Sequence, residues 1–394
     1  MTELQLIRLI QEIAESYRVQ GRQTGLPHGP GKGIGDDCAL LPCSGDREIL
    51  VTTDTMCQGI HFDLSYYTPE ILGRRLAAVN LSDIAAMGGV PAYGFLNLEI
   101  PEAIFSGREG RDVFCPDRFW RLFIIGLCEE LGRFGALLMG GDTVTTGCSS
   151  LSVTLTLIGE VEGGKALMRS GAQPGDLIFL SGPVGEADAG LILLQGIKGP
   201  VLRHHQYPSE GMASRKRVCM ACPGHGARAK AYFPSRFRTA WKRLVSRHLL
   251  PEPRIRLGRL IAELGATSCI DLSDGMATDV AHIAQDSGCR LIIHEDRVPI
   301  SRALRQMALQ QGRGPFQRNW LRTRIFSGGE DFELLWTVHP DNVDRMIQGL
   351  QDGLGMKPWL VGEVQQGQGV QLKTISGKMV DISFKGYEHG RSFH

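Results

Sequence analysis

The sequence predicts a mixed α/β protein built from two domains. Its 394 residues are more than one hydrophobic core usually holds, so we expect two. Segments with a strand pattern alternate along the chain with helical segments: Leu151–Val161 alternates apolar and polar residues, and Arg118–Phe134 has helical spacing. We expect an N-terminal domain over residues 1–163 and a C-terminal α/β domain over residues 164–394.

The composition is that of a globular protein in water. It is 42% hydrophobic and 22% charged with a formal net charge of +1, which favours neither nucleic acid nor a membrane surface as a partner. The sequence holds no apolar run of the roughly 18 residues that a membrane span needs. Residues 1–14 combine acids with helical periodicity and predict an amphipathic helix instead of a signal peptide. The ten cysteines lack disulfide-type spacing, so we expect reduced thiols and a cytoplasmic location.

The stretch Gly33–Asp63 is the first that suggests chemistry. Asp36 and Asp37 follow glycines, and a β-rich run ends at Thr52-Thr53-Asp54, which we expect at the end of a strand. Carboxylates together with hydroxyls and backbone carbonyls are hard oxygen ligands that suit Mg²⁺. The alternative interpretation is that aspartate and glycine are simply common in turns.

A long helix should begin after Thr68, which is followed by a proline and an acid, and end near Met87 at two glycines. The helix is apolar nearly all round and is therefore expected to be buried. It nevertheless carries Asn80 and Asp83 on one face. Since a buried carboxylate needs a cation or strong donors, Asp83 is a candidate metal ligand, or else a hydrogen-bond partner of a neighbouring loop.

The rest of the first domain supplies a second acidic corner. We expect a strand over Leu96–Ile100, the helix Arg118–Phe134, and a strand Ala136–Met139 that ends in a corner of glycine, aspartate and threonine, Gly140–Thr143.

The second domain repeats the pattern. A polar turn with Arg169, which could bind phosphate or simply face solvent, leads into a strand over Leu177–Leu180 and a helix over Glu186–Leu194. Asp271-Leu272-Ser273-Asp274-Gly275 forms a third aspartate-rich corner, before a helix that runs to about Gln285. Gly328–Asp331 precedes the strand Phe332–Val338.

A basic insertion interrupts the second domain at about Arg203–Arg238. From Arg203 to His248 the chain has eleven Lys or Arg against one acid, with aromatic residues between them, a composition that could contact nucleic acid. The pair Cys219 and Cys222 lacks the second ligand pair of a typical zinc site. We expect a solvated insertion, with nucleic acid an unlikely partner, and a helix from Trp241 to Leu250.

The acids taken together predict phosphoryl transfer. Two like charges about 4 Å apart repel by roughly 4 kcal/mol at an effective dielectric near 20. A set of carboxylates this dense therefore needs divalent cations to stay ionised. A polyphosphate needs the same cations. The sequence has no G-x-x-x-x-G-K-[ST] and no protein-kinase motif set. We therefore expect catalysis by positioning and charge neutralisation, without a covalent intermediate.

The motifs resemble one family. G-D-D-C-A-L-L, T-T-D-T, G-I-H-F, A-V-N-L-S-D-I-A-A-M-G-G, G-G-D-T, A-L-M-R-S-G-A-Q-P-G-D, D-L-S-D-G, S-G-G-E-D-F-E-L and G-Y-E-H occur in order. They are similar to those of the thiamine-monophosphate kinase family, which is related to aminoimidazole ribonucleotide synthetase and selenophosphate synthetase. The resemblance implies direct in-line transfer of the γ-phosphoryl group from ATP to thiamine phosphate.

The resemblance also implies roles for individual residues. The implied Mg²⁺ ligands are Asp37, Thr52, Thr53, Asp54, Asp83, Asp142, Asp271 and Asp274, of which Asp37, Asp54, Asp83 and Asp142 are the implied catalytic set. ATP would contact Gly141, Asp142, Arg169 and Ser273. The thiamine phosphate pocket would include His61, Glu330 and Tyr387.

The family's fold would be the two-domain aminoimidazole ribonucleotide synthetase-like fold, in which the N-terminal domain pairs with its twin in a homodimer to close a barrel-like sheet. Two alternatives remain. One is another ATP-dependent synthetase that forms a phosphorylated amide or selenide intermediate. The other is a catalytically silent nucleotide-binding regulator that uses the basic insertion.

Overall fold

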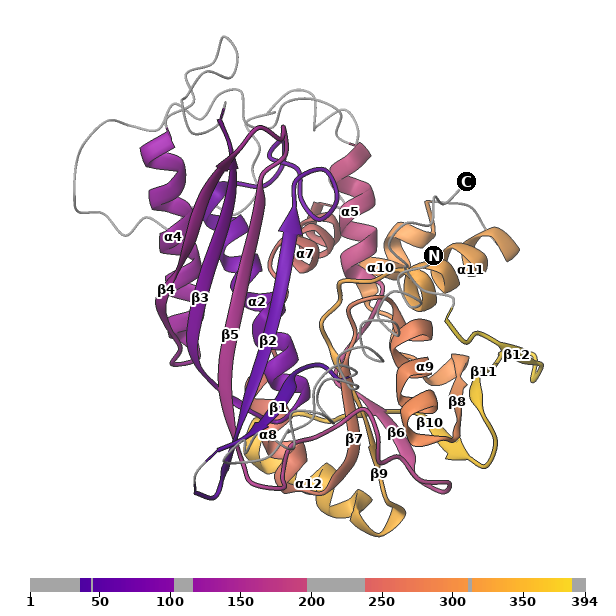
Figure 1. Cartoon of the computed structure of the whole chain (residues 1–394). Helices are drawn as coiled ribbons and strands as arrows, with labels where there is room; N and C mark the ends of the chain where they lie inside the picture. Colours follow the sequence, from indigo (N-terminus) through magenta and orange to yellow (C-terminus); the bar gives the residue numbers. More distant parts are fainter. Residues whose placement is uncertain (1–35, 44, 103–115, 197–237, 311–313, 385–394) are drawn as a thin grey trace.

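The structure is a computed structural model that describes residues 36–43, 45–102, 116–196, 238–310 and 314–384. Their strands form two mixed sheets, one of five strands and one of seven, with helices packed against them (Figure 1). Within these ranges, no helix has both the length and the apolar character needed to cross a bilayer. The expected N-terminal helix, the basic insertion with Cys219 and Cys222, and Tyr387 lie outside the described residues.

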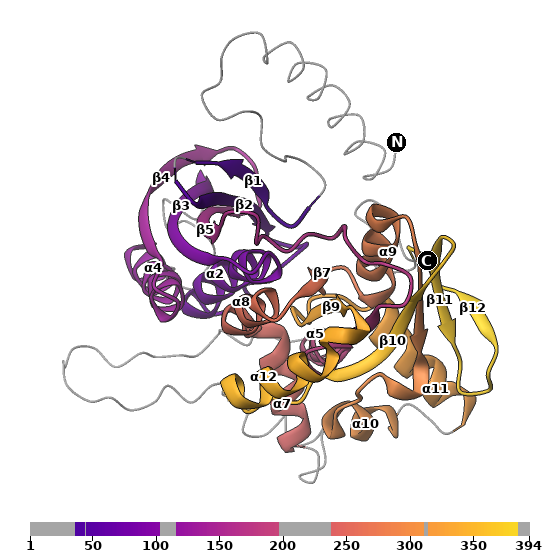
Figure 2. The ribbon, with the colours of Figure 1, turned by 90° about the horizontal axis from the view of Figure 1, so that it is seen from below.

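The first sheet is antiparallel except for its last pair of strands, which is parallel. It curves so that two helices cover one of its faces (Figure 2). Its strands, in spatial order, are β1 (Ala39–Pro42), β2 (Arg47–Cys57), β5 (Ser152–Glu162), β3 (Val90–Pro101) and β4 (Leu137–Thr146), and the covering helices are α2 (Pro69–Ala86) and α4 (Pro116–Arg133).

Helix α2 forms where the sequence predicts it. The Thr68 hydroxyl accepts a hydrogen bond from the main-chain N of Ile71, and the helix is buried along most of its length. It packs closely against α4, because a Cβ placed on Gly126 of α4 would lie 2.1 Å from the main-chain O of Glu70. On another side α8 (Ile255–Glu263) approaches so closely that a Cβ on Gly258 would lie 1.9 Å from Ala85 O.

Two predicted strand ends are wrong. Thr52-Thr53-Asp54 lies inside β2, which continues to Cys57 because its partner β5 continues pairing to Ser152. The expected corner at Gly140–Thr143 lies inside β4, where a register shift opposite Gly94 and Phe95 absorbs one extra residue. The alternating strand predicted at Leu151–Val161 is confirmed as β5.

The second sheet contains antiparallel pairs and one parallel pair, β8 with β11. Its spatial order is β12 (Met379–Asp381), β11 (Gly369–Lys373), β8 (Arg290–His294), β10 (Trp359–Gln365), β6 (Leu177–Leu180), β9 (Leu334–Val338) and β7 (Ala266–Asp271). The predicted strand Leu177–Leu180 is confirmed as β6.

Helices and short turns surround this second sheet. The α-helices are α5 (Glu186–Gly196), α7 (Arg238–Leu249), α8, α9 (Met276–Ser287), α10 (Arg302–Ala308), α11 (Pro315–Arg322) and α12 (Val343–Leu354). The short turns are η3 (Glu295–Arg297), the π-helical η4 (Thr323–Ser327) and η5 (Pro340–Asn342). The helices expected from Glu186, after Gly275 and near Trp241 are confirmed as α5, α9 and α7.

The two sheets meet at α2. This helix of the first sheet's layer contacts α7, α8 and β7 of the second. The end of β7 at Asp271 therefore lies beside α2, and a candidate site can draw residues from both layers.

Candidate active site

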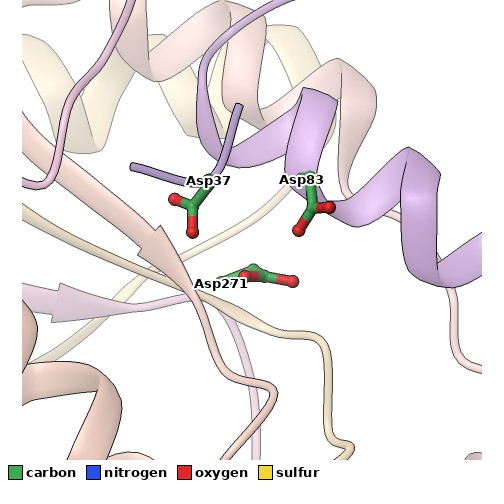
Figure 3. A group of neighbouring side chains, drawn as sticks. All are labelled: Asp37, Asp83 and Asp271. Atoms are coloured by element: carbon green, nitrogen blue, oxygen red, sulfur yellow. The ribbon is translucent and has the colours of Figure 1, made fainter. Parts of the chain in front are cut away.

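Three acids from distant parts of the chain meet where the two layers join. Asp37 lies just before β1, Asp83 is on α2 and Asp271 ends β7. A carboxylate oxygen from each lies within 4.8 Å of the others, and the three side chains face a common space (Figure 3). Asp37 and Asp271 are 8% and 3% exposed. The predicted convergence of these three acids is therefore present in a single chain.

Each of these carboxylates has a donor beside it. Arg169 donates to Asp37 Oδ1 from Nε at 3.1 Å and from Nη2 at 2.5 Å. The Thr52 hydroxyl donates to Asp83, and the Ser82 hydroxyl donates to Asp271, each at 2.5 Å. The second oxygen of Asp37 is buried and has no hydrogen-bond partner among the described residues.

Burial and mutual repulsion disfavour the charged forms of these acids. Burial, with smaller effects of Asp271 and Asp36, raises the pKa of Asp37 to about 7, although Arg169 opposes the rise. Burial and the charges of Asp274 and Asp37 raise the pKa of Asp54 to about 6. Burial also raises the pKa of Asp271 to about 6, against the Ser82 hydrogen bond and Arg169. Loss of solvent around Asp83, with the charges of Asp54 and Asp271, raises the pKa of this half-buried acid well above the ordinary value.

These residues fit a divalent cation. They are oxygen ligands, they converge within a few ångströms, and one buried oxygen of Asp37 lacks a hydrogen-bond donor. At an effective dielectric near 20, each pair of like charges about 4 Å apart costs roughly 4 kcal/mol, and Arg169 alone cannot offset several such pairs. A hard cation such as Mg²⁺ would remove this cost.

Two predicted ligands point away from the cluster. Side chains alternate along β2, so Thr52 and Asp54 face α2 while Thr53 faces the opposite side, where its hydroxyl lies 3.1 Å from that of Thr156. Asp142 also points to that side, in register with Asn97, Thr154 and Thr55 across the sheet.

The strand order also separates Asp142 from the cluster in the direction across the strands. Gly141, its neighbour, is three strands from Asp54, which corresponds to about 14 Å. Within one chain, Asp142 therefore lies apart from Asp37, Asp54 and Asp83, and its role as a ligand stays a prediction.

A second polar cluster surrounds Glu330. Arg75 on α2 donates from Nη2 to Glu330 Oε1 at 2.6 Å, and His248 Nδ1 lies 3.1 Å from Glu330 Oε2 without the alignment of a hydrogen bond. The Tyr67 hydroxyl is 3.2 Å from His248 Nε2. His61, also predicted in the acceptor pocket, is half-buried after β2, and its Nδ1 accepts a hydrogen bond from the main-chain N of Cys57 at 3.0 Å.

Sequence reasoning missed several of these residues. Ser82 immediately precedes Asp83, and Asp279, which accepts from the main-chain N of Asp274, lies one turn into α9. Ser82 could have been found as a polar residue on the helix that was predicted to be buried, whereas no burial was predicted for α9. Arg75 carried the same signal, since it is a charged residue in a helix expected to be buried all round. No such signal in the sequence pointed to His248, because the helical spacing of α7 does not show which residues His248 contacts.

Comparisons with known proteins cover most of the chain. Residues 35–161 match the AIR synthase related protein N-terminal domain, and residues 220–375 match the AIR synthase related protein C-terminal domain. The thiamine-monophosphate kinase of Bacillus subtilis (strain 168) is 32% identical over 359 residues, which are 91% of this chain and 93% of that protein. That of Escherichia coli (strain K12) is 35% identical over 359 residues, 91% of each chain.

Among solved structures, AaThiL complexed with AMPPCP and TMP is similar to this chain. The TM-score is 0.70 at 27% sequence identity, and the match covers 98% of this chain and 97% of that one. The similarity thus extends through both sheets described above.

Proposed function

This chain belongs to the thiamine-monophosphate kinase family, and we propose that it transfers the γ-phosphoryl group of ATP to thiamine phosphate, giving thiamine diphosphate and ADP. The family matches confirm both the resemblance found in the sequence motifs and the two-domain AIR synthase-like fold. Relatives at 32% and 35% identity over most of the chain carry the name of this activity, and a neighbour of similar fold was solved with AMPPCP and TMP.

One observation of the chain itself carries the proposal: Asp37, Asp83 and Asp271 converge within 4.8 Å beside Arg169. Two negatively charged reactants must approach each other in this reaction, so a site needs more positive charge than its side chains supply. A cluster of acids beside an arginine suits cations that are shared between protein and phosphates.

We assign the metal role to Mg²⁺, held by Asp37, Asp54, Asp83, Asp271 and Asp274, with Thr52 orienting Asp83. When bound, Mg²⁺ neutralises phosphate charge and fixes the reacting groups in line. The Thr53 side chain is left out of this set because it faces the other side of β2. Asp279 accepts from the main-chain N of Asp274 and so orients that corner.

The chain's own groups then act by binding and orienting. Arg169 already contacts Asp37 through one edge of its guanidinium, and we propose that it shares its charge with an ATP phosphate. Ser273 is proposed to contact ATP as well. Glu330, His61 and Tyr387 are proposed to line the thiamine phosphate pocket. A phosphate acceptor has its second pKa near 6, so it is already largely an anionic nucleophile at neutral pH and needs no general base.

We also propose a homodimer that completes the site with Asp142 of the partner subunit. The face of the first sheet away from α2 and α4 is rich in exposed apolar side chains on its last two strands: Tyr93, Phe95, Leu137, Met139 and Val144. An apolar face of this kind favours burial against a second copy. Asp142 and Thr53 lie on this same face. If two copies pair through it, Asp142 of one subunit would face the site of the other.

The direct test is to incubate the purified full chain with ATP, Mg²⁺ and thiamine phosphate and to measure ADP and thiamine diphosphate. We expect the two products in equal amounts, with none of the diphosphate in EDTA. ATP hydrolysis without thiamine diphosphate would contradict the proposal and favour another ATP-dependent enzyme of this fold. ATP binding with neither product would favour a regulator.

A further inference from the structure

Helix α2 carries a buried cation that no proposed step uses. Arg75 is 1% exposed and lies eight residues before Asp83, which places it about 12 Å along the helix from the acidic cluster. A fully buried guanidinium is costly unless it is paired, so its partners indicate what it is for.

Those partners come from the second layer of the molecule. Arg75 Nη2 donates to Glu330 Oε1 at 2.6 Å, and Nη1 donates to the main-chain O of His248 at the end of α7. The guanidinium carbon also lies 5.9 Å from the centre of the Phe332 ring. One side chain from the first layer thus holds the end of α7 and the segment that carries Glu330 in the second layer.

The segment that Arg75 contacts has an unusual backbone. Glu330 and Phe332 have φ values of +68° and +50°, in the left-handed region that residues with a side chain rarely adopt. Such residues are strained and persist only where neighbouring contacts enforce them. Arg75 touches both of them, through the Glu330 carboxylate and over the Phe332 ring.

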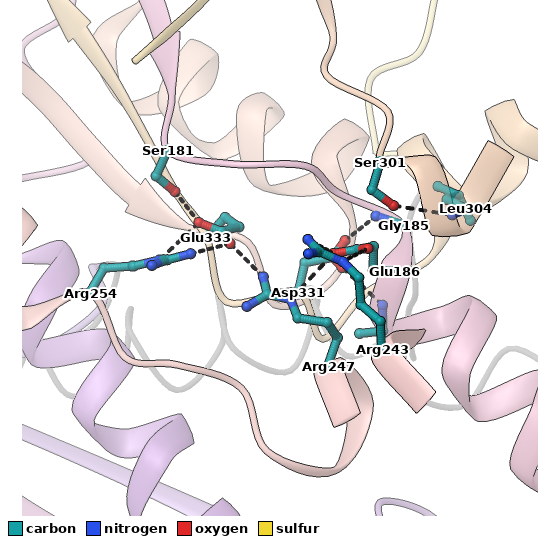
Figure 4. A network of polar contacts seen from close by, with 11 residues as sticks. Ser181, Gly185, Glu186, Arg243, Arg247, Arg254, Ser301, Leu304, Asp331 and Glu333 are labelled. Atoms are coloured by element: carbon teal, nitrogen blue, oxygen red, sulfur yellow. Dashed lines mark hydrogen bonds and ion pairs between the residues drawn. The ribbon is translucent and has the colours of Figure 1, made fainter. Parts of the chain in front are cut away.

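The two other residues of the segment, Asp331 and Glu333, are anchored by further polar contacts (Figure 4). Asp331 accepts hydrogen bonds from the main-chain N of Gly185 and of Ala187, at the start of α5. Glu333 accepts from Arg247 and Arg254. These contacts fix the far side of the segment 330–333 and leave the Glu330 side to Arg75.

The same segment runs beside the metal corner. The main-chain N of Glu330 donates to Ser273 O at 2.7 Å, that of Phe332 donates to Leu272 O at 2.9 Å, and that of Leu272 donates to Glu333 O at 2.9 Å. Asp271, whose carboxylate belongs to the acidic cluster, precedes Leu272 directly. A displacement of segment 330–333 would therefore also move the corner that carries the acids.

The charges around Glu330 indicate what Arg75 does for this carboxylate. Burial is the largest single effect and raises the pKa of Glu330, but Arg75 and His248 together outweigh it, and the net pKa is about 2. Burial lowers the pKa of His248, against the charge of Glu330, whereas the pKa of Arg75 is raised, so Arg75 is the partner that stays charged at neutral pH. Without Arg75, the half-buried Glu330 carboxylate would lose the guanidinium that fixes it and could turn toward solvent.

We propose that Arg75 is a positioning residue for the acceptor: it holds the Glu330 carboxylate ionised and aimed into the thiamine phosphate pocket. Arg75 and Asp83 lie on one rigid helix, so α2 sets the spacing between the acceptor's binding residue and the metal ligands. This inference rests on the proposed function and on Glu330 as a residue of the acceptor pocket.

The test compares Arg75→Met and Arg75→Lys with Arg74→Met in the full chain. Arg74 is the adjacent residue on α2, and its ion pairs are with Glu70, Glu129 and Glu130, away from the site. We expect Arg75→Met to raise the KM for thiamine phosphate on the order of 10²-fold, because small misplacements of a binding group have effects of that size. The KM for ATP should stay unchanged, Arg75→Lys should recover most of the loss, and Arg74→Met should behave as the wild type.

A second variant separates positioning from general support of the fold. Glu330→Gln keeps the shape of the side chain, and adding Arg75→Met to it should raise the acceptor's KM no further, because Arg75 acts through Glu330. The double variant loses both charges together, so comparing it with Glu330→Gln remains possible if Arg75→Met alone does not fold. Multiplying effects in the double variant, an equal rise in the KM for ATP, or an unchanged acceptor KM in Arg75→Met would overturn the inference. A wild-type protein that makes no thiamine diphosphate would instead overturn the proposed function.

Discussion

Single residues in the acidic cluster are best understood by what each carboxylate lacks. Asp271 has the Ser82 hydroxyl and Asp83 has the Thr52 hydroxyl, whereas one oxygen of Asp37 has no donor among the described residues. Hydroxyl donors orient a carboxylate without neutralising it. The cluster is therefore well ordered for a cation and poorly compensated without one.

Asp83→Asn tests this directly. The amide keeps the size of the side chain and can still meet Thr52, but it removes the charge that we assign to the metal. We expect turnover to fall on the order of 10²–10³-fold, the usual effect of losing one preorganised electrostatic group. The melting temperature measured in EDTA should not fall, because the change removes a repelling charge. Steady-state rates at saturating ATP and thiamine phosphate, with a thermal unfolding curve for the same sample, check both expectations. Turnover close to that of the wild type would contradict the assignment.

For single residues, the sequence predicted which side chains could bind a metal better than it predicted where they lie in the fold. Asp37, Asp83 and Asp271 could be nominated because the same pattern recurs along the chain, with carboxylates beside glycine or serine, and because a carboxylate in an apolar helix needs a partner. Asp142 satisfied the same local criterion and lies on the other face of the sheet. Which face a residue takes depends on strand register, and local sequence does not determine register where glycines and a bulge interrupt the pattern.

Among the elements, α2 organises the fold because it packs against both layers. Its apolar surface was evident in the sequence, as were its cap and its end. The strands were harder to delimit, since glycine, threonine and aspartate in β2 and β4 resemble turns locally. Pairing with a long neighbour overrides that local preference, so both strands continue past the predicted ends.

The close crossing of α2 and α4 gives a prediction at this scale. A Cβ on Gly126 would collide with the main chain at Glu70, whereas a Cβ on Gly132 of the same helix would meet nothing within 4 Å. We expect Gly126→Ala to lower the free energy of unfolding by about 1–3 kcal/mol. Gly132→Ala should raise it by about 0.5–1 kcal/mol, because alanine loses less backbone entropy in a helix.

Urea unfolding of the two variants and the wild type measures these changes. The pair is matched for helix and for chemical change, so a shared effect of alanine cancels. Equal stability of the two variants would mean that the helices do not cross at Gly126.

For the whole molecule, the raised pKa values couple stability to pH and to metal. Asp37, Asp54 and Asp271 have pKa values of about 7, 6 and 6, above the value near 3.9 of an unfolded chain. The folded state therefore binds more protons than the unfolded state. Their contribution to stability is complete below about pH 4 and is lost as the pH rises to about 7.

Mg²⁺ should replace those protons. We expect the rise in melting temperature caused by saturating Mg²⁺, relative to EDTA, to be larger at pH 8 than at pH 5, because protons compete with the metal only at the lower pH. Thermal unfolding at both pH values, with and without Mg²⁺, measures this rise in melting temperature. Subtracting the melting temperature in EDTA at the same pH cancels the effect of other titrating groups. Asp37→Asn serves as the control and should flatten the difference. An equal rise at both pH values would contradict the prediction.

The placement of Asp142 on the face opposite Asp83 has a consequence for mixtures of inactive proteins. If each catalytic centre draws Asp83 from one subunit and Asp142 from the other, Asp83→Asn and Asp142→Asn chains are each dead alone yet complement each other. Random exchange makes half of the dimers hybrids, and each hybrid has one centre with both acids intact, so about a quarter of all centres should recover. Mixing the two inactive variants would thus restore activity if the centre is shared between subunits. If each centre is built within one chain, the mixture would stay inactive.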